Sequence, residues 1–410
     1  MTGTVTPATG ATGETGATAA TESAETEPVV RRHAAFPLLD GYRALAATAV
    51  LLTHVGFQTG AALQGPAAGL LARLDFGVTV FFLLSGFLLY RPHAVAHLRS
   101  TPSPRVGPYL WRRALRILPA YWLAVVGAML LLPENHHAGP GVWVSQLLLL
   151  QTYQVSGLLP GLSQVWSLGT EVAFYLFLPV LGLLVHRLGG RDPRARLRRE
   201  LVLLAVLAAL SLAYRVWVFA AHADLRLLYW LPAYLDWFAV GMAFAAVSAF
   251  YAQVPPARRG RIGVLDEIAA APGSCWLIGG ALLALSTTVL GGPLDLTPPT
   301  AAESVTKHLL YAAAGAFLFL PGVLGRSDQG VVRRFLATRP MTRLGLVSYG
   351  VFLWNMAMLF VAMRVLDQAL FKGGFWPVLA LTATLTVTVA SLSWLLVEQP
   401  LLRRLRGWVR

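Results

Sequence analysis

Long apolar runs dominate the sequence, and polar connections separate them at fairly regular intervals. A helix needs about 20 consecutive apolar residues to cross the hydrocarbon core of a bilayer. Runs near that length lie at roughly 38–58, 74–91, 113–132, 165–186, 201–220, 228–249, 274–291, 308–324, 346–365 and 376–397. The pattern therefore predicts an all-α polytopic membrane protein with about ten transmembrane helices.

The segments outside these runs predict the domain organisation. Residues 1–34 are rich in Thr, Ala, Gly and Glu and lack apolar periodicity, so we expect a disordered cytoplasmic tail. The membrane domain is expected at 35–404, followed by a short basic tail at 405–410. The apolar stretch Trp143–Tyr153 is too short to cross, and we expect it to be a re-entrant or interfacial outer segment.

The placement of arginine predicts the orientation of the helices. The chain has 33 Lys and Arg residues against 19 Asp and Glu, a formal net charge of +14. Most of the basic residues stand before the first run or in every second connection. Because positive residues stay on the cytoplasmic side, we expect both termini inside the cell membrane. The charge thus reflects topology, and no nucleic-acid-binding pattern competes with it.

The first apolar run carries ionisable residues. Asp40 and Arg43 stand at its start and His54 near its end. Such groups are costly in hydrocarbon and by default face the protein interior, where they mark a pathway or a reaction site. Arg43 and His54 are eleven residues apart, which puts them on nearly the same helix face, about 16 Å apart along the axis. The alternative is a surface-reaching arginine and a structural histidine.

A second polar face lies in the run at 165–186. Ser167, Glu171 and Tyr175 are spaced by four residues and share that face. In the predicted topology, Glu171 and His54 both lie in the outer half of the membrane and could line one cavity. There a neutral imidazole can take a proton from a hydroxyl while a carboxylate orients it. Hydrogen bonding between helices is the alternative for the serine and tyrosine.

Arginines at the start of the third run are candidate phosphate ligands. Arg113 and Arg116, three residues apart, share a helix face and could hold a phosphate bidentately, with Arg112 beside them. Ordinary positive-inside arginine is the alternative. Two other charged residues, Arg215 and Asp236, favour an ion pair across the hairpin of the fifth and sixth runs, although Asp236 is also a candidate substrate contact.

Two further features predict packing and the absence of a metal site. Ser85 and Gly86, in the run at 74–91, are close-packing positions between helices. His136 and His137 have no third ligand at a suitable spacing, so no metal site is predicted.

Six short motifs follow one another in a characteristic order. They are LDGYRALA at 39–46, FFLLSGFLLYRP at 81–92, RRALRILPAYW at 112–122, WSLGTEVAFYLFLP at 166–179, SYGVFLW at 348–354 and VEQPLLR at 397–403. With them, the chain resembles the acyltransferase-3 family of integral membrane acyltransferases. The resemblance implies ten core helices and transfer of an acyl group, usually acetyl, from acyl-coenzyme A to a hydroxyl on a sugar or glycoside.

The same resemblance implies roles for individual residues. Arg43 and His54 match the family's Arg–His pair, and Glu171 matches the glutamate of its SLxxE motif. Arg113 and Arg116 match its RxxR motif. After SYGVFLW many members have histidine, whereas this chain has Asn355, which is expected to hold an acceptor hydroxyl together with Ser167 and Tyr175.

These expectations combine into one mechanism. The arginines near 112–116 hold the phosphates of acyl-coenzyme A at the cytoplasmic mouth, and the thioester passes Arg43 to reach His54. His54 acts as general base on an acceptor hydroxyl of an envelope glycan, a lipid-linked sugar or a glycosylated metabolite. One alternative is a transporter or flippase that uses His54, Glu171 and Arg43 as a proton or substrate path. Another is a catalytically inactive binding member of the family.

Overall fold

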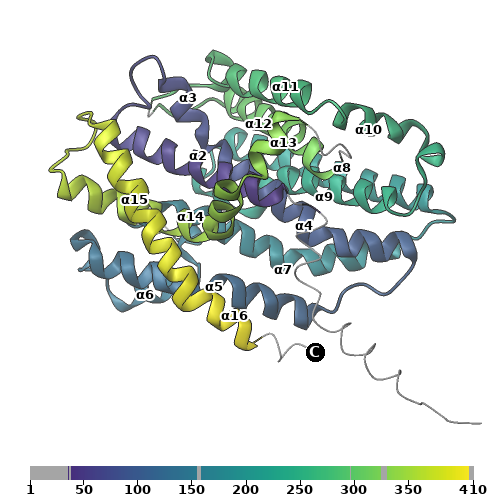
Figure 1. Cartoon of the computed structure of the whole chain (residues 1–410), viewed down its shortest axis with the longest axis horizontal. Coiled ribbons are helices and arrows are strands. Elements are labelled where there is room, and N and C mark those ends of the chain that lie inside the picture. The colour runs from purple at the N-terminus through teal and green to yellow at the C-terminus, as the bar shows by residue number, and fades with distance from the viewer. Residues whose placement is uncertain (1–35, 37, 155–157, 296, 325–329, 406–410) are drawn as a thin grey trace, which may run out of the picture. The chain divides into compact units, whose positions relative to one another are not determined.

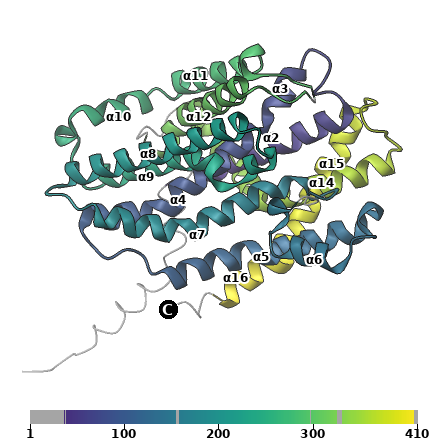
Figure 2. The same ribbon diagram turned by 180° about the vertical axis from the view of Figure 1, so that it is seen from behind.

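The computed structural model describes residues 36, 38–154, 158–295, 297–324 and 330–405. These residues are helical with connecting turns and contain no strand, which confirms the all-α prediction. The predicted tails, 1–34 and all but the first residue of 405–410, lie outside the described residues. Figures 1 and 2 show the helices from opposite sides, most of them roughly parallel or antiparallel to one another.

Each predicted apolar run overlaps one of the longer helices. In chain order these helices are α2 (Leu39–Thr59), α4 (Gly77–Arg99), α5 (Val106–Leu131), α7 (Trp166–Arg187), α8 (Pro193–Ala220), α9 (Leu235–Tyr251), α11 (Pro272–Leu285), α12 (Ala301–Val323), α14 (Arg339–Val365) and α15 (Phe375–Ser393). The short helices are α3 (Ala68–Arg73), α6 (Pro140–Leu147), α10 (Val264–Ala269), α13 (Val331–Leu336) and α16 (Gln399–Leu405). A π-helical turn, Trp394–Glu398, joins α15 to α16.

Seven helical segments of the described chain are long and apolar enough to cross a membrane. They are Ala68–Arg99, Val106–Leu131, Ser163–Arg187, Pro193–Ala220, Leu231–Tyr251, Arg339–Val365 and Phe375–Arg404. The pair Gly260–Ala269 and Pro272–Leu285, bent by 84°, adds an eighth if it is one span. α2 and α12 have 21 and 23 residues but are less apolar, because each carries ionisable side chains. A total of ten crossings, with both termini inside, stays a prediction.

The third helix begins earlier than the sequence predicts. α5 starts at Val106, so Arg112, Arg113 and Arg116 lie in its second and third turns instead of at its start. An arginine in the third turn lies deeper along the helix than one at the first residue. The three arginines are therefore flanked by helix on both sides.

The fifth helix also begins early, for a local reason. Asp192 precedes α8 and accepts hydrogen bonds from the backbone N–H groups of Arg194 and Ala195 at 2.8 and 3.0 Å, and Pro193 occupies the first helical position. The hydrogen bond from the Ala195 N–H also holds the pKa of the Asp192 carboxyl below its usual value. This cap extends the helix well beyond the apolar run that predicted it.

The short outer segment does not form a spanning helix. α6 has eight residues, about 12 Å of helix, and a single 3₁₀ turn, Gln151–Tyr153, follows it. Neither is long enough to cross a bilayer. The placement of Trp143–Tyr153 in the outer leaflet stays a prediction.

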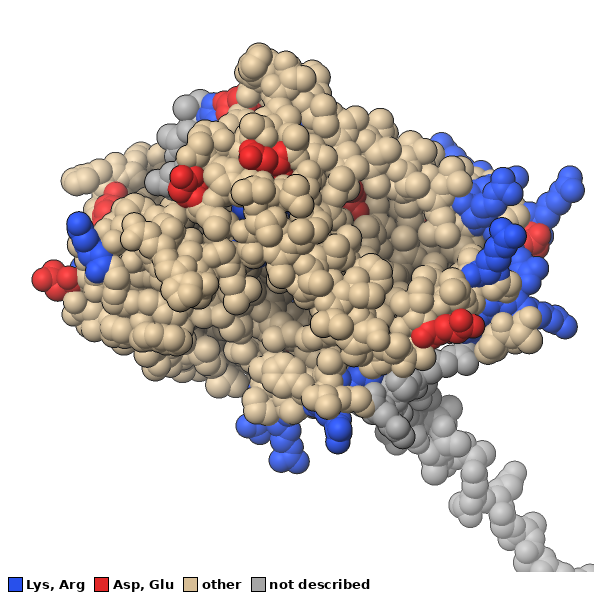
Figure 3. Space-filling model, turned by 90° about the horizontal axis from the view of Figure 1, so that it is seen from above, with Lys and Arg blue, Asp and Glu red and all other residues tan. Residues whose placement is uncertain are grey.

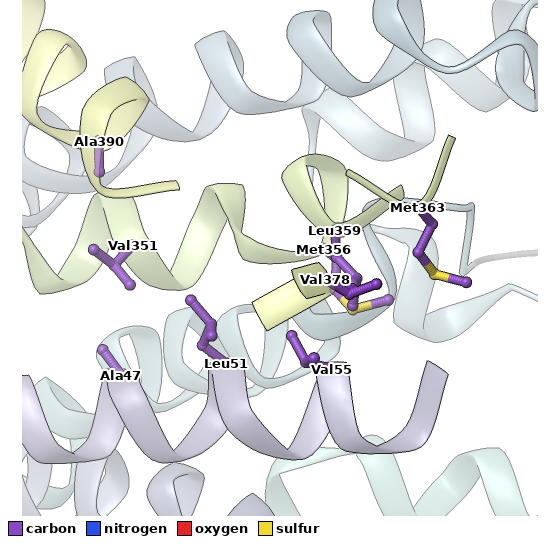
Figure 4. Packing of buried hydrophobic residues seen from close by; sticks show 9 residues of the cluster. All are labelled: Ala47, Leu51, Val55, Val351, Met356, Leu359, Met363, Val378 and Ala390. Atoms are coloured by element: carbon purple, nitrogen blue, oxygen red, sulfur yellow. The ribbon is translucent and has the colours of Figure 1, made fainter. Parts of the chain in front are cut away.

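α2 is held against α14 and α15 by a cluster of buried apolar side chains (Figure 4). The cluster consists of Ala47, Leu51 and Val55 from α2, Val351, Met356, Leu359 and Met363 from α14, and Val378 and Ala390 from α15. By helix geometry, Arg43 and His54 lie at the edge of the face that Ala47, Leu51 and Val55 define. Packing of this apolar face therefore turns both ionisable side chains toward α14.

α4 and α9 approach each other closely because glycines face the contact. A Cβ on Gly241 of α9 would collide with the backbone oxygen of Leu83, and one on Gly86 of α4 would collide with that of Phe238. Small residues let membrane helices pack backbone to backbone. This contact fixes the position of α4 and of Ser85, the residue that directly precedes Gly86.

We expect Gly241→Ala to lower the stability of the protein by about 1–3 kcal/mol, because the added methyl group overpacks the α4–α9 contact. Gly280→Ala in α11 is the matched control, since a Cβ there meets nothing within 4 Å. Thermal denaturation in detergent measures the difference. Equal melting temperatures for the two variants would contradict the close contact.

Charged side chains are unevenly distributed over the surface. Figure 3 shows most of the visible lysine and arginine side chains at the right-hand end and along the lower edge, with the acidic ones mainly toward the other end. A basic end is the feature expected of the cytoplasmic side. Which end faces the cytoplasm stays a prediction.

Candidate active site

A cavity opens among α2, α4, α5, α7 and α14; Figure 2 shows α4, α7 and α5 as neighbours in this region. It encloses about 830 Å³ of space free of protein atoms, including the part open to solvent. Its polar lining consists of Arg43, Ser85, Arg113, Arg116, Ser167, Glu171, Tyr175, Ser348 and Tyr349. Apolar walls with a few convergent polar groups are typical of a binding site. Six of the predicted site residues thus meet in one cavity.

Glu171 is anchored from two helices. Its Oε1 accepts hydrogen bonds from Ser85 of α4 and, at 2.6 Å, from the hydroxyl of Tyr175 one turn further along α7. Both bonds are accepted by Oε1. Oε2 makes no hydrogen bond with the residues that the structure describes. Glu171 therefore presents one fixed carboxylate oxygen to the cavity.

Three arginines line the same cavity as this carboxylate. Arg113 and Arg116 come from α5, and Arg43 comes from the first turns of α2. Arg43 forms an ion pair with Asp40, with Nη1 and Oδ1 2.7 Å apart, and its side chain stays 21% exposed. The Nε of Arg113 is buried without a hydrogen-bond partner among the described residues. An excess of guanidinium groups over carboxylates suits an anionic ligand.

Arg112 does not join this group. It is exposed on α5 and is absent from the cavity lining, in contrast to Arg113 and Arg116. Successive residues on a helix point about 100° apart, so the face that presents Arg113 cannot also present its neighbour. Of the three arginines predicted to bind phosphate together, only Arg113 and Arg116 therefore line the cavity.

His54 is held by Asn355, the residue that stands where a histidine was expected. The His54 Nδ1 lies 2.7 Å from the Asn355 Oδ1. The Asn355 Nδ2 donates to the carbonyl oxygens of Phe352 and Val351 at 2.6 and 3.3 Å, which fixes the amide with its oxygen toward the imidazole. His54 then donates from Nδ1, and its Nε2 is free to accept a proton.

The histidine lies beyond the cavity lining. Neither His54 nor Asn355 lines the cavity, whereas Phe352, one turn before Asn355 on α14, does. The ring of Phe352 meets that of Phe81 from α4 edge to face, with centroids 5.9 Å apart, and both rings line the cavity. Glu171 and His54 therefore share no hydrogen bond, and a pair of aromatic side chains lies along the way from the arginines toward the imidazole.

The interpretation of Asp236 as a partner of Arg215 is wrong. Asp236 bonds His308 of α12, with Oδ1 and Nε2 2.8 Å apart, and accepts from Ser211 at 3.1 Å. Arg215 instead donates to the hydroxyl of Ser304 and the carbonyl oxygen of Ala233, both at 3.2 Å. His308 and Ser304, both of α12, are therefore the partners of Asp236 and Arg215. The two charged residues do not pair with each other. Asp236 is also absent from the cavity lining, so its role as a substrate contact stays a prediction.

Little in the sequence indicated that Ser85, Tyr349 and His308 make notable contacts in the structure. Ser85 was interpreted as a packing position, but it donates to Glu171. Tyr349 lines the cavity and its hydroxyl donates to the carbonyl oxygen of Ile117 at 3.0 Å. His308 is buried and stacks on Trp237 with ring centroids 4.2 Å apart. Ser85 and Tyr349 both belong to the conspicuous motifs at 81–92 and 348–354. Both would have been found if every polar residue of those motifs had been treated as a candidate site residue.

Metal ligands do not gather in this fold. No three His, Cys, Asp or Glu side chains come together as a candidate metal site among the described residues.

Comparison of the sequence with known proteins finds similarity to acyltransferases. A family model described as an acyltransferase domain matches residues 36–397. The chain is 24% identical over 388 residues to the peptidoglycan O-acetyltransferase OatA of Listeria monocytogenes, covering 89% of this chain and 55% of that protein. It is 31% identical over 339 residues to the exopolysaccharide production protein ExoZ of Rhizobium meliloti, covering 81% and 90%.

A third relative matches a shorter part. The acyltransferase MdmB of Streptomyces mycarofaciens is 32% identical over 171 residues, 39% of this chain and 42% of that protein. The chain thus spans about half of OatA but most of ExoZ. No solved structure matches.

Proposed function

Because the chain belongs to the acyltransferase-3 family, we propose that this multi-pass membrane protein transfers an acyl group, with acetyl expected, to a hydroxyl of a glycan. The two relatives named for peptidoglycan O-acetylation and exopolysaccharide production support a cell-envelope glycan as acceptor. A lipid-linked sugar or a glycosylated metabolite offers the same hydroxyl chemistry. The activity belongs to a membrane domain at 35–404 in the cell membrane, with both termini in the cytoplasm.

The proposed donor is acyl-coenzyme A. Its nucleotide carries several phosphates, and Arg43, Arg113 and Arg116 line one cavity where guanidinium groups can hold phosphate oxygens bidentately. In the predicted topology α5 enters from the cytoplasm, so the arginine pair faces the compartment that contains the donor. The flexible pantetheine arm then extends past Phe81 and Phe352 toward His54.

The reaction step is assigned to His54. Its Nε2 removes the proton from the acceptor hydroxyl while that oxygen attacks the thioester carbonyl carbon. A C–O bond forms, the C–S bond breaks, and the leaving thiolate of coenzyme A takes the proton from the imidazolium. The Asn355 Oδ1 accepts the hydrogen bond from Nδ1 and stabilises the charged ring.

Glu171 is assigned to substrate positioning. It is bonded to Ser85 and Tyr175 and does not contact His54, so its free oxygen is directed at a group inside the cavity. Ser167 lines the same wall and completes the polar surface against which a bound substrate lies. The observation that carries the proposal is this meeting of three arginines and one carboxylate in a cavity next to the His54–Asn355 pair.

The decisive experiment is incubation of the purified protein with acetyl-coenzyme A labelled in the acetyl group. We expect release of free coenzyme A together with transfer of the label to glycan. Movement of glycan across proteoliposomes with no transfer of label would instead identify a transporter and contradict the proposal.

Asn355→Leu is expected to lower kcat by roughly 10- to 100-fold, because the side chain keeps its volume but no longer fixes the tautomer of His54. The KM for the donor should change little, since Asn355 is absent from the cavity that holds the arginines. Asn355→Asp keeps an oxygen acceptor and should retain most of the activity. An unchanged kcat in Asn355→Leu would show that the amide does not position His54.

A further inference from the structure

A second, smaller hollow lies beside the first turn of α7. The connection after α6 and the connection after α8 form it together, and it encloses about 400 Å³, including the part open to solvent. Its lining residues are Thr152, Tyr153, Gln154, Asp224, Arg226, Leu227 and Trp230. In the predicted topology both connections lie outside the membrane, on the side opposite the basic loops.

Two aromatic rings form a corner of this hollow. The rings of Tyr153 and Trp230 have centroids 5.3 Å apart and are inclined by 59°, so each presents a face at a different angle. Tyr153 is 46% exposed. The Trp230 Nε1 donates to the carbonyl oxygen of Thr152 at 3.3 Å, which holds the indole in place. Rings that are fixed and solvent-facing offer apolar surface at a low cost in conformational entropy.

The other lining residues are mostly polar. Asp224 and Arg226 form an exposed ion pair, and Gln154 adds an exposed amide. The hydrogen bond from the Arg226 side chain lowers the pKa of the Asp224 carboxyl to about 2, so this acceptor stays ionised at any physiological pH. The hydroxyl of Thr152, a residue only 4% exposed, has no hydrogen-bond partner among the described residues.

Aromatic contacts connect the hollow to the main cavity. Tyr229, next to Trp230 in the chain, lies against Trp166 with ring centroids 5.1 Å apart. Trp166 in turn meets Phe82 at 6.5 Å, and Phe82 lines the main cavity. Trp166 also directly precedes Ser167 on α7. Three successive rings, Tyr229, Trp166 and Phe82, therefore link the hollow to the main cavity.

The combination suits a sugar better than other ligands. A pyranose ring has apolar C–H faces that pack on aromatic rings, and hydroxyl groups at its edge that bond carboxylate, guanidinium and amide groups. A lipid chain would leave the ion pair unsatisfied, and a phosphate would meet the carboxylate of Asp224. We propose that this hollow is a subsite for the acceptor glycan, where a neutral sugar unit of the chain binds. The assignment rests on the proposed acyl transfer to a glycan.

The test uses the full-length protein in nanodiscs and two neutral oligosaccharides, cellotetraose and chitotetraose, as probes. Titration calorimetry and saturation-transfer NMR measure binding to the wild type and to Tyr153→Ala, Trp230→Ala and Tyr153→Phe. We expect the two alanine variants to weaken binding at least fivefold, and Tyr153→Phe, which keeps the ring, to bind as the wild type does. Trp376→Ala removes a 75% exposed tryptophan of α15 and is the matched control, which should bind normally.

Release of coenzyme A from acetyl-coenzyme A is measured in parallel, because it tests the acyl transfer independently of the sugar site. Oligosaccharide binding that depends on both rings supports the subsite even if that release is absent. Absence of binding to either probe in a wild type that does release coenzyme A overturns the subsite and leaves the acyl transfer standing. Equal loss of binding in Trp376→Ala overturns it as well, since the effect would then not belong to this hollow.

Discussion

His54→Ala is expected to lower the kcat of acyl transfer by roughly 10³-fold, within the 10²- to 10⁴-fold that a positioned general base contributes. The reason is geometric. Asn355 fixes the imidazole with Nε2 unprotonated, and no other histidine in the described part of the chain is hydrogen-bonded to a side-chain amide in this way. The donor KM should stay close to that of the wild type, because the arginines lie in a different part of the site. Transfer of labelled acetyl groups at saturating donor measures both quantities.

His137→Ala is the control for this experiment, since His137 is exposed and lines neither the cavity nor the smaller hollow. Both variants are compared at equal amounts of inserted protein. A His54→Ala enzyme with the wild-type rate would remove the imidazole from the mechanism. The arginine cavity would then have to be considered together with another base, and Glu171 is the one the structure offers there.

Features that depend on neighbouring residues were predictable from the sequence. The apolar runs correspond to helices because hydrophobic length and helix formation in a membrane are local properties. The eleven-residue spacing of Arg43 and His54 predicted a shared helix face, and in the structure His54 bonds Asn355 of α14 while Arg43 lines a cavity that α14 also lines. The RxxR spacing similarly predicted that Arg113 and Arg116 face one space.

Features that depend on how helices pack against one another were not predictable. The partner of His54 lies 301 residues further along the chain, and the partner of Asp236 lies 72 residues further. Asp236 was matched with Arg215 because the two sit on consecutive helices, yet α12 packs against both helices and contributes His308 to the contact. The proximity of charges along the chain is therefore a poor guide to ion pairs between membrane helices.

Depth in the membrane was a second source of error. Topology alone put Glu171 and His54 at a similar depth and so suggested a contact between them. The structure places Glu171 with the arginines, anchored by Ser85 and Tyr175, whereas His54 bonds Asn355 and is absent from the lining of that cavity. Two residues at one predicted depth can face different spaces, because the rotation of each helix about its axis is set by packing.

The double variant Arg113→Ala/Arg116→Ala is expected to lower kcat/KM for acetyl-coenzyme A by on the order of 10²- to 10⁴-fold. Each hydrogen bond between charged groups contributes about 1.5–3 kcal/mol, and both guanidinium groups are lost. The effect should be mostly a rise in the donor KM, since the bonds to phosphate are present in the ground state as well as in the transition state. Arg112→Ala is the matched control, one residue away on the same helix but exposed outside the cavity.

A truncated donor makes the same experiment specific for phosphate recognition. Acetyl-pantetheine carries the thioester but none of the nucleotide phosphates, so the arginine pair has nothing to hold when it is the donor. Wild type and double variant should then use it with the same low kcat/KM, whereas with acetyl-coenzyme A they should differ strongly; that difference is the coupling energy between the arginines and the phosphates. If the double variant lost as much activity with acetyl-pantetheine as with acetyl-coenzyme A, the arginines would be supporting the fold or the chemistry and not binding the nucleotide. The placement of the donor in this cavity would then have to be abandoned.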